Sequence, residues 1–366
     1  MKLSVIILNY NVRYFLELCL KSVEAAIAHI DAEIIVIDNN SPDDSCAMVK
    51  QLFPLVKLIE NKDNSGFSKG NNIGVAQAKG EYLCILNPDT VLAEDTFTKL
   101  IKFTETKKNL GIVGCQLIDG KGKFLPESKR HIPTPKVSLK KVLGRSNDYY
   151  ANHVDIEDTG KVDILVGAFM WLKKDVYNAV GGFDEDYFMY GEDIDLSYKV
   201  LKAGYDNFYF GATTVIHFKG ESTLKDAQYA KRFYGAMQIF YKKHFKQNFV
   251  FNTVVWIGIK MAQLMRKSPV EDVIKLKASY LYSTDFDNTL LKLLPKPTQI
   301  ETVIQEEVKD CSMLVYDFNS LTSSAVIVDM KQKSMQENIV FRFIPKNSKF
   351  IIGSDSAINR GEVLHF

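Results

Sequence analysis

The sequence predicts an α/β protein: a mixed, mostly parallel sheet with flanking helices, followed by a second and smaller α/β module. Short apolar runs of strand length alternate with segments of helical periodicity through the first part of the chain. This alternation is typical of parallel sheets whose two faces are both covered by helices. The chain has 366 residues, which is long enough for two domains.

The first four strands are predicted from apolar runs that end in polar turn residues. These strands are residues 3–8, 33–37, 56–59 and 82–86. Helical periodicity fills the intervals, at residues 14–30, after the second strand, and at residues 70–78. Each strand is therefore followed by a crossover helix, as a parallel sheet requires.

The next part of the chain is less regular. Residues 120–160 mix Gly, Lys, Pro and polar residues, and we interpret them as a long surface excursion. Regular structure resumes at residues 162–172, and a helix is expected at 193–203. Two further strands are predicted at residues 208–210 and 214–218.

The last part of the chain returns to α/β alternation, with strands predicted at residues 279–282, 312–316 and 338–343. No GxGxxG fingerprint follows its first strand, where Ser283-Thr284-Asp285 stands instead, so a nucleotide site there has no support. We expect a domain over residues 1–245, a basic and apolar helical linker over 246–270, and a structural or interaction module over 271–366.

Bulk composition excludes several classes of protein. The net charge of +2 argues against a nucleic-acid binder, and the five scattered cysteines contain no CxxC pair, which fits a reducing, cytoplasmic compartment. No run of about 18 apolar residues is present. Residues 219–267 combine a basic stretch with an apolar helical pattern. Two interpretations stay open: peripheral contact with a membrane surface, or packing on the rest of the protein.

The fourth predicted strand delivers a carboxylate to the edge of the sheet. The run 82–86 ends in Asn87-Pro88-Asp89-Thr90, and ligands of open α/β sheets sit at the carboxyl ends of the strands. A carboxylate there suits a divalent cation that carries a phosphorylated substrate. The alternative is that Asp89 caps a helix starting near Ala93.

Two further segments suit nucleotide binding. Asp38 to Ser41 follow the second strand, where a carboxylate can accept from a nucleobase or a ribose hydroxyl; the alternative is an Asx turn. Residues 64–74 read NSGFSKGNNIG, and their glycines allow close approach of a ligand to a helix N-terminus. The alternative for this segment is tight packing of a helix on the sheet.

Acidic and basic side chains also gather near the end of the first domain. Residues 181–196 read GGFDEDYFMYGEDIDL; aromatic walls would partly desolvate a carboxylate there and raise its pKa toward that of a working general base. The alternative is a helix N-terminus with acids in its first turn. His217 stands at a predicted strand end before a Gly loop, where it could complete coordination begun by Asp89.

Taken in the order in which they occur along the chain, these segments resemble the family 2 glycosyltransferases of the GT-A (nucleotide-diphospho-sugar transferase) fold. Bacterial rhamnosyltransferase-type enzymes of cell-surface polysaccharide synthesis are the group that the chain resembles most. The resemblance covers roughly residues 1–245. It rests on SVIILNYN at 4–11, DNNS at 38–41, NSGFSKGNNIG at 64–74, LNPDT at 86–90, GAFMW at 167–171, GGFDEDYFMYGEDIDL at 181–196 and HFKGES at 217–222.

The resemblance implies a role for each matched position. It implies a Mg²⁺ or Mn²⁺ ion on Asp89 and His217, and catalytic acids at Glu192 and Asp193, with Asp193 the general base. Residues that would contact the nucleotide-sugar donor are Asn9, Asp38, Asn39, Asn64, Gly66, Asn71 and Asn87. The chain has Asn87 where the family has the first acid of its DxD motif, so the contact made by that acid is expected to differ.

The activity implied is metal-dependent, inverting transfer of a sugar from a nucleoside-diphosphate donor to a hydroxyl of a saccharide or lipid-linked saccharide. The QxxRW motif of processive members is absent from the sequence, so transfer of one or a few sugars is expected. Two alternatives stay open: a catalytically silent, glycosyltransferase-like scaffold of a membrane assembly, and a nucleotidyltransferase. The latter would need an early Gly-rich loop, but Asn9-Tyr10-Asn11 follows the first strand.

Overall fold

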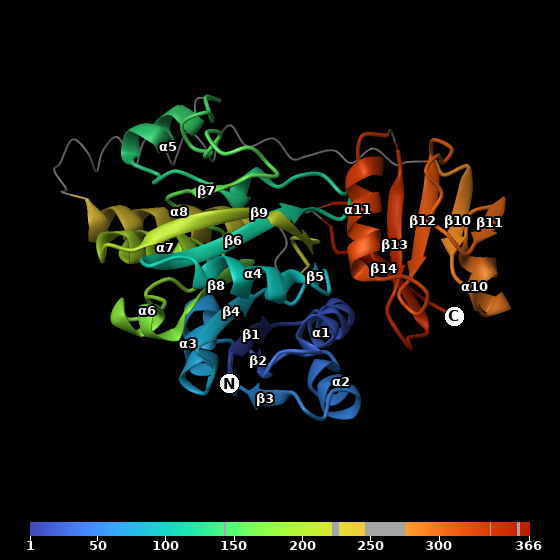
Figure 1. Cartoon of the computed structure of the whole chain (residues 1–366), viewed down its shortest axis with the longest axis horizontal. Helices are drawn as coiled ribbons and strands as arrows, with labels where there is room; N and C mark the ends of the chain where they lie inside the picture. Colours follow the sequence, from blue (N-terminus) through green and yellow to red (C-terminus); the bar gives the residue numbers. More distant parts are fainter. Residues whose placement is uncertain (143, 222–226, 246–274, 337, 357–358) are drawn as a thin grey trace.

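The computed structural model describes all residues except 143, 222–226, 246–274, 337 and 357–358. The described residues form a nine-stranded sheet and a separate six-stranded sheet, which lie side by side in Figure 1. The predicted fold class, a mixed α/β sheet with flanking helices plus a small C-terminal α/β module, is confirmed. The linker expected at 246–270 lies wholly outside the described residues.

Four parallel strands make up one half of the large sheet, in the order β3, β2, β1, β4. Their bounds are β1 Leu3–Asn9, β2 Ala32–Asp38, β3 Lys57–Glu60 and β4 Tyr82–Leu86. The other half is mixed: β8 lies antiparallel between β4 and β6, and β9 runs parallel to β6 with β5 and β7 antiparallel beside it. These strands are β5 Thr90–Leu92, β6 Leu110–Ile118, β7 Thr159–Lys161, β8 Phe169–Lys173 and β9 Asp206–His217.

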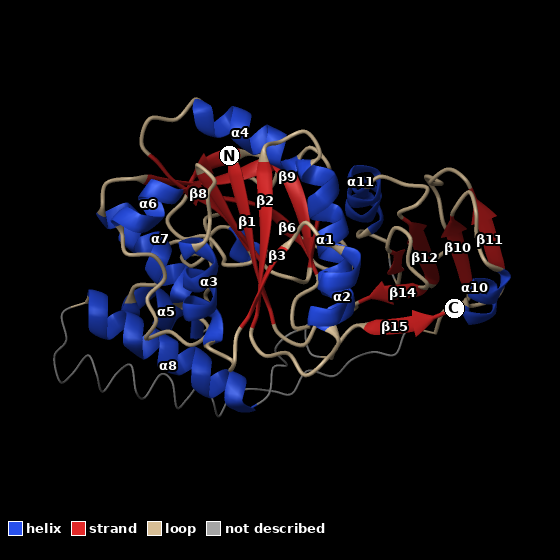
Figure 2. Cartoon of the chain, turned by 90° about the horizontal axis from the view of Figure 1, so that it is seen from below, coloured by secondary structure: helices blue, strands red, loops and turns tan. Residues whose placement is uncertain are grey.

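Helices cover both faces of this sheet (Figure 2). One core lies under α1 (Arg13–Ile27), α2 (Ser45–Leu52) and α4 (Thr96–Glu105). The other lies under α3 (Gly66–Ala76), α6 (Lys174–Ala179) and α7 (Glu192–Lys202). Alternation along β1 explains the two layers, because Val5 and Ile7 point into the first core and Ile6 into the second. The long helix α8 (Ala227–His244) follows β9 in the chain.

The C-terminal module is a sheet with the order β11, β10, β12, β13, β14, β15. Its first four strands in that order are parallel and the last two are antiparallel. The strands are β10 Ala278–Tyr282, β11 Thr298–Glu301, β12 Ser312–Asp317, β13 Val340–Ile344, β14 Phe350–Gly353 and β15 Glu362–His365. Helix α10 spans Asn288–Leu293, and α11 (Ser323–Lys333) faces the large sheet in Figure 1.

Three expectations from the sequence need correction. Residues 120–160 are not only a surface excursion, because they contain α5 (Pro135–Val142), a short 3-10 helix η1 (Pro126–Ser128) and the buried Lys129 and Arg130. The strands expected at 208–210 and 214–218 are one strand, β9, whose register against β6 shifts in between. Strand β6, at the centre of the mixed half, was not identified from the sequence.

Among the helices that the structure describes, none is both long and apolar enough to span a bilayer. Of the segment 219–267 proposed for membrane contact, only residues 219–221 and 227–245 are described. The apolar helical pattern at 249–265 falls outside the described part, so membrane contact stays a prediction.

Candidate active site

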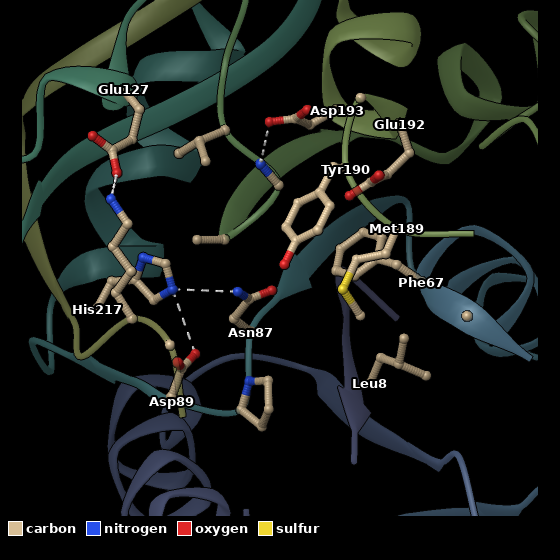
Figure 3. A pocket seen from close by; sticks show the side chains of 18 of the residues that line it. Leu8, Phe67, Asn87, Asp89, Glu127, Met189, Tyr190, Glu192, Asp193 and His217 are labelled. Carbon is tan, nitrogen blue, oxygen red and sulfur yellow. Dashed lines mark hydrogen bonds and ion pairs between the residues drawn. The ribbon is translucent and has the colours of Figure 1, made fainter. Parts of the chain in front are cut away.

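A cavity of about 300 Å³ opens at the carboxyl edge of the parallel strands (Figure 3). Strands β1, β2 and β4 all end there because they are parallel, so the residues that follow them meet at one rim. Chain segments far apart in the sequence line it. The lining includes Tyr10, Asn39, Asn64, Gly66, Asn87, Asp89, Glu127, Arg130, Tyr190, Glu192, Asp193, His217 and Lys219.

Asp89 and His217 face each other at one end of the cavity. They are brought together because β5 and β9 pair antiparallel with Thr90 opposite His217, and the Phe218 N–H donates to the Asp89 carbonyl at 3.0 Å. His217 Nε2 lies 3.5 Å from Asp89 Oδ1 and 3.3 Å from Asn87 Nδ2. Both side chains are almost fully buried.

This pair has the chemistry of a partial cation site. Asp89 Oδ1 is buried and has no hydrogen-bond partner among the described residues. In the tautomer with the proton on Nδ1, His217 Nε2 carries one lone pair, which either accepts from the Asn87 amide or binds a cation. A divalent cation between Nε2 and Asp89 Oδ1 would satisfy both atoms in place of the Asn87 contact. No group of three metal-ligating side chains occurs within the described ranges. The residues therefore fit an ion whose remaining ligands come from a substrate and water.

Asp193 lies at another part of the same cavity, in the first turn of α7. Its Oδ2 accepts from Arg130 Nη2 at 2.6 Å and from the Gly167 N–H at 3.2 Å. Its Oδ1 accepts from the Ile194 N–H at 2.8 Å. The guanidinium and two backbone donors stabilise the carboxylate as an anion and fix its orientation.

Glu192 is buried beside Asp193 but is held differently. Its Oε2 has no hydrogen-bond partner in the described part of the chain. Burial, and then the negative charge of Asp193, raise the pKa of Glu192 to about 8. At neutral pH, Glu192 is therefore mostly a neutral acid, whereas Asp193 is paired with Arg130. The two neighbouring acids are therefore not equivalent.

The opposite wall carries the Asn-rich segment. Asn39 Nδ2 donates to the Gly66 carbonyl at 3.1 Å and lies 3.3 Å from Asn64 Oδ1. Asn64 Oδ1 also accepts from the Gly66 N–H at 3.1 Å. These bonds hold the turn that begins α3 against the end of β2. Asn39, Asn64, Gly66 and Asn87 thus all line the cavity, as expected of residues that contact a ligand.

Three other residues expected to contact the donor do not line the cavity in this structure. Asp38 is buried at the end of β2, where its carboxylate accepts from Asn9 Nδ2 at 2.7 Å and from Ser41 Oγ at 2.6 Å. Asn71 donates from α3 to the Phe67 carbonyl at 3.0 Å. The Asp38 cluster stabilises the turn after β2, and a donor contact by Asp38, Asn9 or Asn71 stays a prediction.

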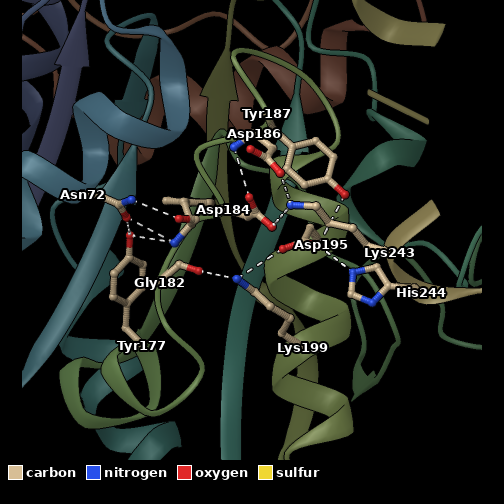
Figure 4. A network of polar contacts seen from close by, with 11 residues as sticks. Asn72, Tyr177, Gly182, Asp184, Asp186, Tyr187, Asp195, Lys199, Lys243 and His244 are labelled. Carbon is tan, nitrogen blue, oxygen red and sulfur yellow. Dashed lines mark hydrogen bonds and ion pairs between the residues drawn. The ribbon is translucent and has the colours of Figure 1, made fainter. Parts of the chain in front are cut away.

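Residues 182–191 form a loop rich in aromatic residues, and its end lines the cavity. A network of polar contacts holds this loop in place (Figure 4). Asp195 is buried on α7 and accepts from Lys199 at 3.2 Å, and His244 Nε2 lies 2.6 Å from its Oδ1. Lys243 pairs with Asp186 at 2.6 Å and also contacts Asp184. The end of α8 is therefore joined to both α7 and the loop that carries Met189 and Tyr190.

Sequence reasoning missed Arg130, Glu127 and Lys219 as members of the site. Arg130 and Glu127 belong to the segment that we interpreted as a surface excursion, and Lys219 pairs with Glu127 across the cavity. No local pattern marks Arg130 or Glu127, because each contacts a side chain far away in the sequence; Lys219 lies in the HFKGES segment but had no role assigned to it.

Comparisons with known proteins agree with the motifs. Residues 4–181 match the model described as glycosyl transferase family 2. The chain is 26% identical over 242 residues to an N-acetylglucosaminyl-diphospho-decaprenol L-rhamnosyltransferase of Mycobacterium tuberculosis, which covers 61% of this chain and 78% of the relative. It is 31% identical over 160 residues to the rhamnosyltransferase WbbL of Escherichia coli, which covers 42% of this chain and 61% of that relative.

A solved structure with an overall likeness is that of the mannosyltransferase PcManGT from Pyrobaculum calidifontis in complex with GDP-Man and Mn²⁺. The TM-score is 0.49 and the sequence identity 18%, over 72% of this chain and 73% of the other.

Proposed function

We propose that the chain, whose residues 4–181 match glycosyl transferase family 2, is a member of this family. In this proposal it transfers a sugar from a nucleoside-diphosphate donor to a hydroxyl of a saccharide or lipid-linked saccharide in cell-surface polysaccharide synthesis. The observation that supports this proposal best is that Asp89, His217 and Asp193 line one cavity. A candidate cation site and a candidate base thus share a space into which donor and acceptor could both reach. The rhamnosyltransferase names of two relatives support a deoxyhexose or hexose donor.

In the proposed mechanism, Asp193 takes the proton from the acceptor hydroxyl as that oxygen attacks the anomeric carbon. Arg130 and the Gly167 N–H hold the carboxylate in place before the acceptor arrives, so little reorganisation accompanies the transfer. Attack from the face opposite the leaving diphosphate inverts the anomeric centre. Glu192, neutral at pH 7, can donate a hydrogen bond to the acceptor without competing for its proton.

At the other end of the cavity, Asp89 and His217 would hold a Mg²⁺ or Mn²⁺ ion. When bound, such an ion neutralises the charge that develops on the diphosphate leaving group. Asn87 stands beside His217, and its amide would leave Nε2 to the ion. Within the part of the chain that the structure describes, no third metal-ligating side chain joins these two, so the donor diphosphate would have to complete the coordination.

Thermal-shift measurements with UDP, dTDP and GDP, each with and without Mn²⁺, test the nucleotide and metal parts of this proposal. We expect at least one nucleotide to stabilise the wild type more strongly with Mn²⁺ than with EDTA. Asp89→Ala should remove the metal-dependent part of the shift. Asp95→Ala is the control, because Asp95 pairs with Lys99 on the surface and does not line the cavity. Equal shifts for wild type and Asp89→Ala would contradict the metal assignment.

A panel of nucleotide sugars, scored for hydrolysis and transfer by mass spectrometry, tests the chemistry. Asp193→Asn should reduce transfer about 10²- to 10⁴-fold, as loss of a general base commonly does, while the nucleotide-induced thermal shift persists. If Asp193→Asn transfers at the wild-type rate and Glu192→Gln does not, the base would be Glu192. No transfer or hydrolysis with any donor, combined with no metal-dependent shift, would instead favour a silent scaffold.

A further inference from the structure

The segment after β9 connects the candidate metal site to the C-terminal module. Phe218, the residue after His217, is buried between the two units. Its ring centroid lies 5.0 Å from that of Phe15 on α1 and 5.4 Å from that of Phe343 on β13. These rings belong to one apolar core that residues of both units build together. The side chain next to the candidate metal ligand is thus packed against the C-terminal module.

After Phe218 the chain bends at Gly220 and Glu221, and the Glu221 carboxylate points at that module. Lys219 and Gly220 both have left-handed backbone conformations, with φ of 64° and 91°, and such a pair forms a tight turn. Glu221 then lies buried with 2% exposure. Its Oε2 accepts from the Gly361 N–H at 2.7 Å.

A second contact brings the two units together at the same place. The turn after β6 holds Gly120, and a Cβ atom built there would lie 2.0 Å from the Ser354 carbonyl oxygen and 3.2 Å from the Phe218 ring. Only a glycine leaves room for this approach. Phe218, Glu221 and the Gly120 turn therefore converge on one patch of the C-terminal module, formed by Ser354, Gly361 and Phe343.

We propose that the C-terminal module supports the metal-binding loop, and that Glu221 is the positioning residue that fixes this loop to the module. The loop, residues 217–221, is held at Phe218 by packing, at Lys219 by its pairing with Glu127, and at Glu221 by the hydrogen bond from the Gly361 N–H of the module. Since His217 is the first residue of the loop, freeing Glu221 lets the imidazole move away from Asp89. The inference rests on the proposed metal site and gives residues 275–366 a role in it.

Glu94 supplies a matched control. It is another carboxylate of the N-terminal unit that accepts backbone N–H groups of the C-terminal module, from Ser323 at 2.6 Å and Ser324 at 3.0 Å at the start of α11. Glu94 does not belong to the loop that carries His217. Loss of Glu94 and loss of Glu221 should both weaken the attachment of the module, but only loss of Glu221 should disturb the metal ligand.

The test uses the full-length chain and a titration of Mn²⁺ in the presence of UDP, dTDP or GDP, whichever binds to the wild type. We expect Glu221→Ala to raise the Mn²⁺ concentration for half-saturation about ten-fold, the lower end of what loss of a group supporting a metal ligand commonly costs. Glu221→Gln keeps an acceptor oxygen for the Gly361 N–H and should stay within about two-fold of the wild type. Glu94→Ala should also stay within about two-fold, whatever its effect on thermal stability.

Glu221→Asp provides a second probe if Glu221→Ala does not fold, because its shorter side chain keeps the charge but withdraws the carboxylate from Gly361. We expect a smaller rise in the same direction. Equal Mn²⁺ half-saturation for the wild type and a folded Glu221→Ala or Glu221→Asp variant would overturn the positioning role while leaving the metal site intact. Equal rises for the Glu94 and Glu221 variants would also overturn it. A wild type without metal-dependent binding would instead refute the metal site itself.

Discussion

Removing the Arg130 guanidinium should destabilise the fold and impair transfer at the same time. The side chains of Arg130 and Asp193 are only 8% and 11% exposed, and Arg130 Nη2 lies 2.6 Å from Asp193 Oδ2. Taking away one member of a buried ion pair leaves the other charge without compensation, which commonly costs about 3–5 kcal/mol. We therefore expect Arg130→Met to lower the free energy of unfolding by about that amount. Loss of the bond from Arg130 Nη2 to the Leu165 carbonyl adds to it.

The double variant Arg130→Met/Asp193→Asn separates stability from function. Because it removes both charges, much of the lost stability should return, and the double-mutant cycle should show a coupling of more than about 1 kcal/mol. Transfer should not return, since the double variant has no base. Urea unfolding gives the stabilities, and initial rates with the active donor give the activities.

Exposed charges provide the comparison for this cycle. Lys161 and Asp206 form an ion pair at 2.9 Å with side-chain exposures of 66% and 39%, so Lys161→Met should change the unfolding free energy by less than about 1 kcal/mol. The reasoning fails if Arg130→Met is as stable as Lys161→Met. It also fails if Arg130→Met transfers sugar at the wild-type rate, because Asp193 would then not depend on the guanidinium for its orientation.

Two further expectations follow from burial and close contact. The pKa of Glu192 is raised from 4.5 to about 8 in the folded protein, so its neutral form stabilises the fold fully below pH 4.5, and this contribution is lost as the pH rises through about 8. The melting temperature of the wild type should thus fall relative to that of Glu192→Gln between pH 5 and 8; a constant difference would refute the shift. Gly120→Ala should cost about 1–3 kcal/mol of stability, because the new methyl group meets the Ser354 carbonyl. Gly235→Ala, on α8 with no atom within 4 Å of the added Cβ, should instead be neutral or stabilising in the same urea experiment.

The alternation of strands and helices could be predicted because it depends on neighbours in the chain. The parallel strands β1 to β4 carry apolar runs that end in polar turns, and the structure places each within about two residues of its predicted bounds. The split expected within residues 208–218 reflects a real irregularity, since the register of β9 against β6 shifts between Phe210 and Thr214. The small and polar residues 211–214 interrupt the apolar pattern of the sequence. The strand nevertheless continues, because β6 pairs with β9 on both sides of the register shift.

The sequence by itself determined which residues stand at the ends of the strands, and so placed Asn39, Asn64, Asp89 and His217 at one rim. Tertiary structure alone decided what those residues contact. Asp193 pairs with a residue 63 positions away, and Glu221 with one 140 positions away. Such contacts leave no periodicity in the sequence, because they form only when separate segments close around a shared core. For the same reason, the packing of the C-terminal module against the candidate metal site could be seen only in the folded chain.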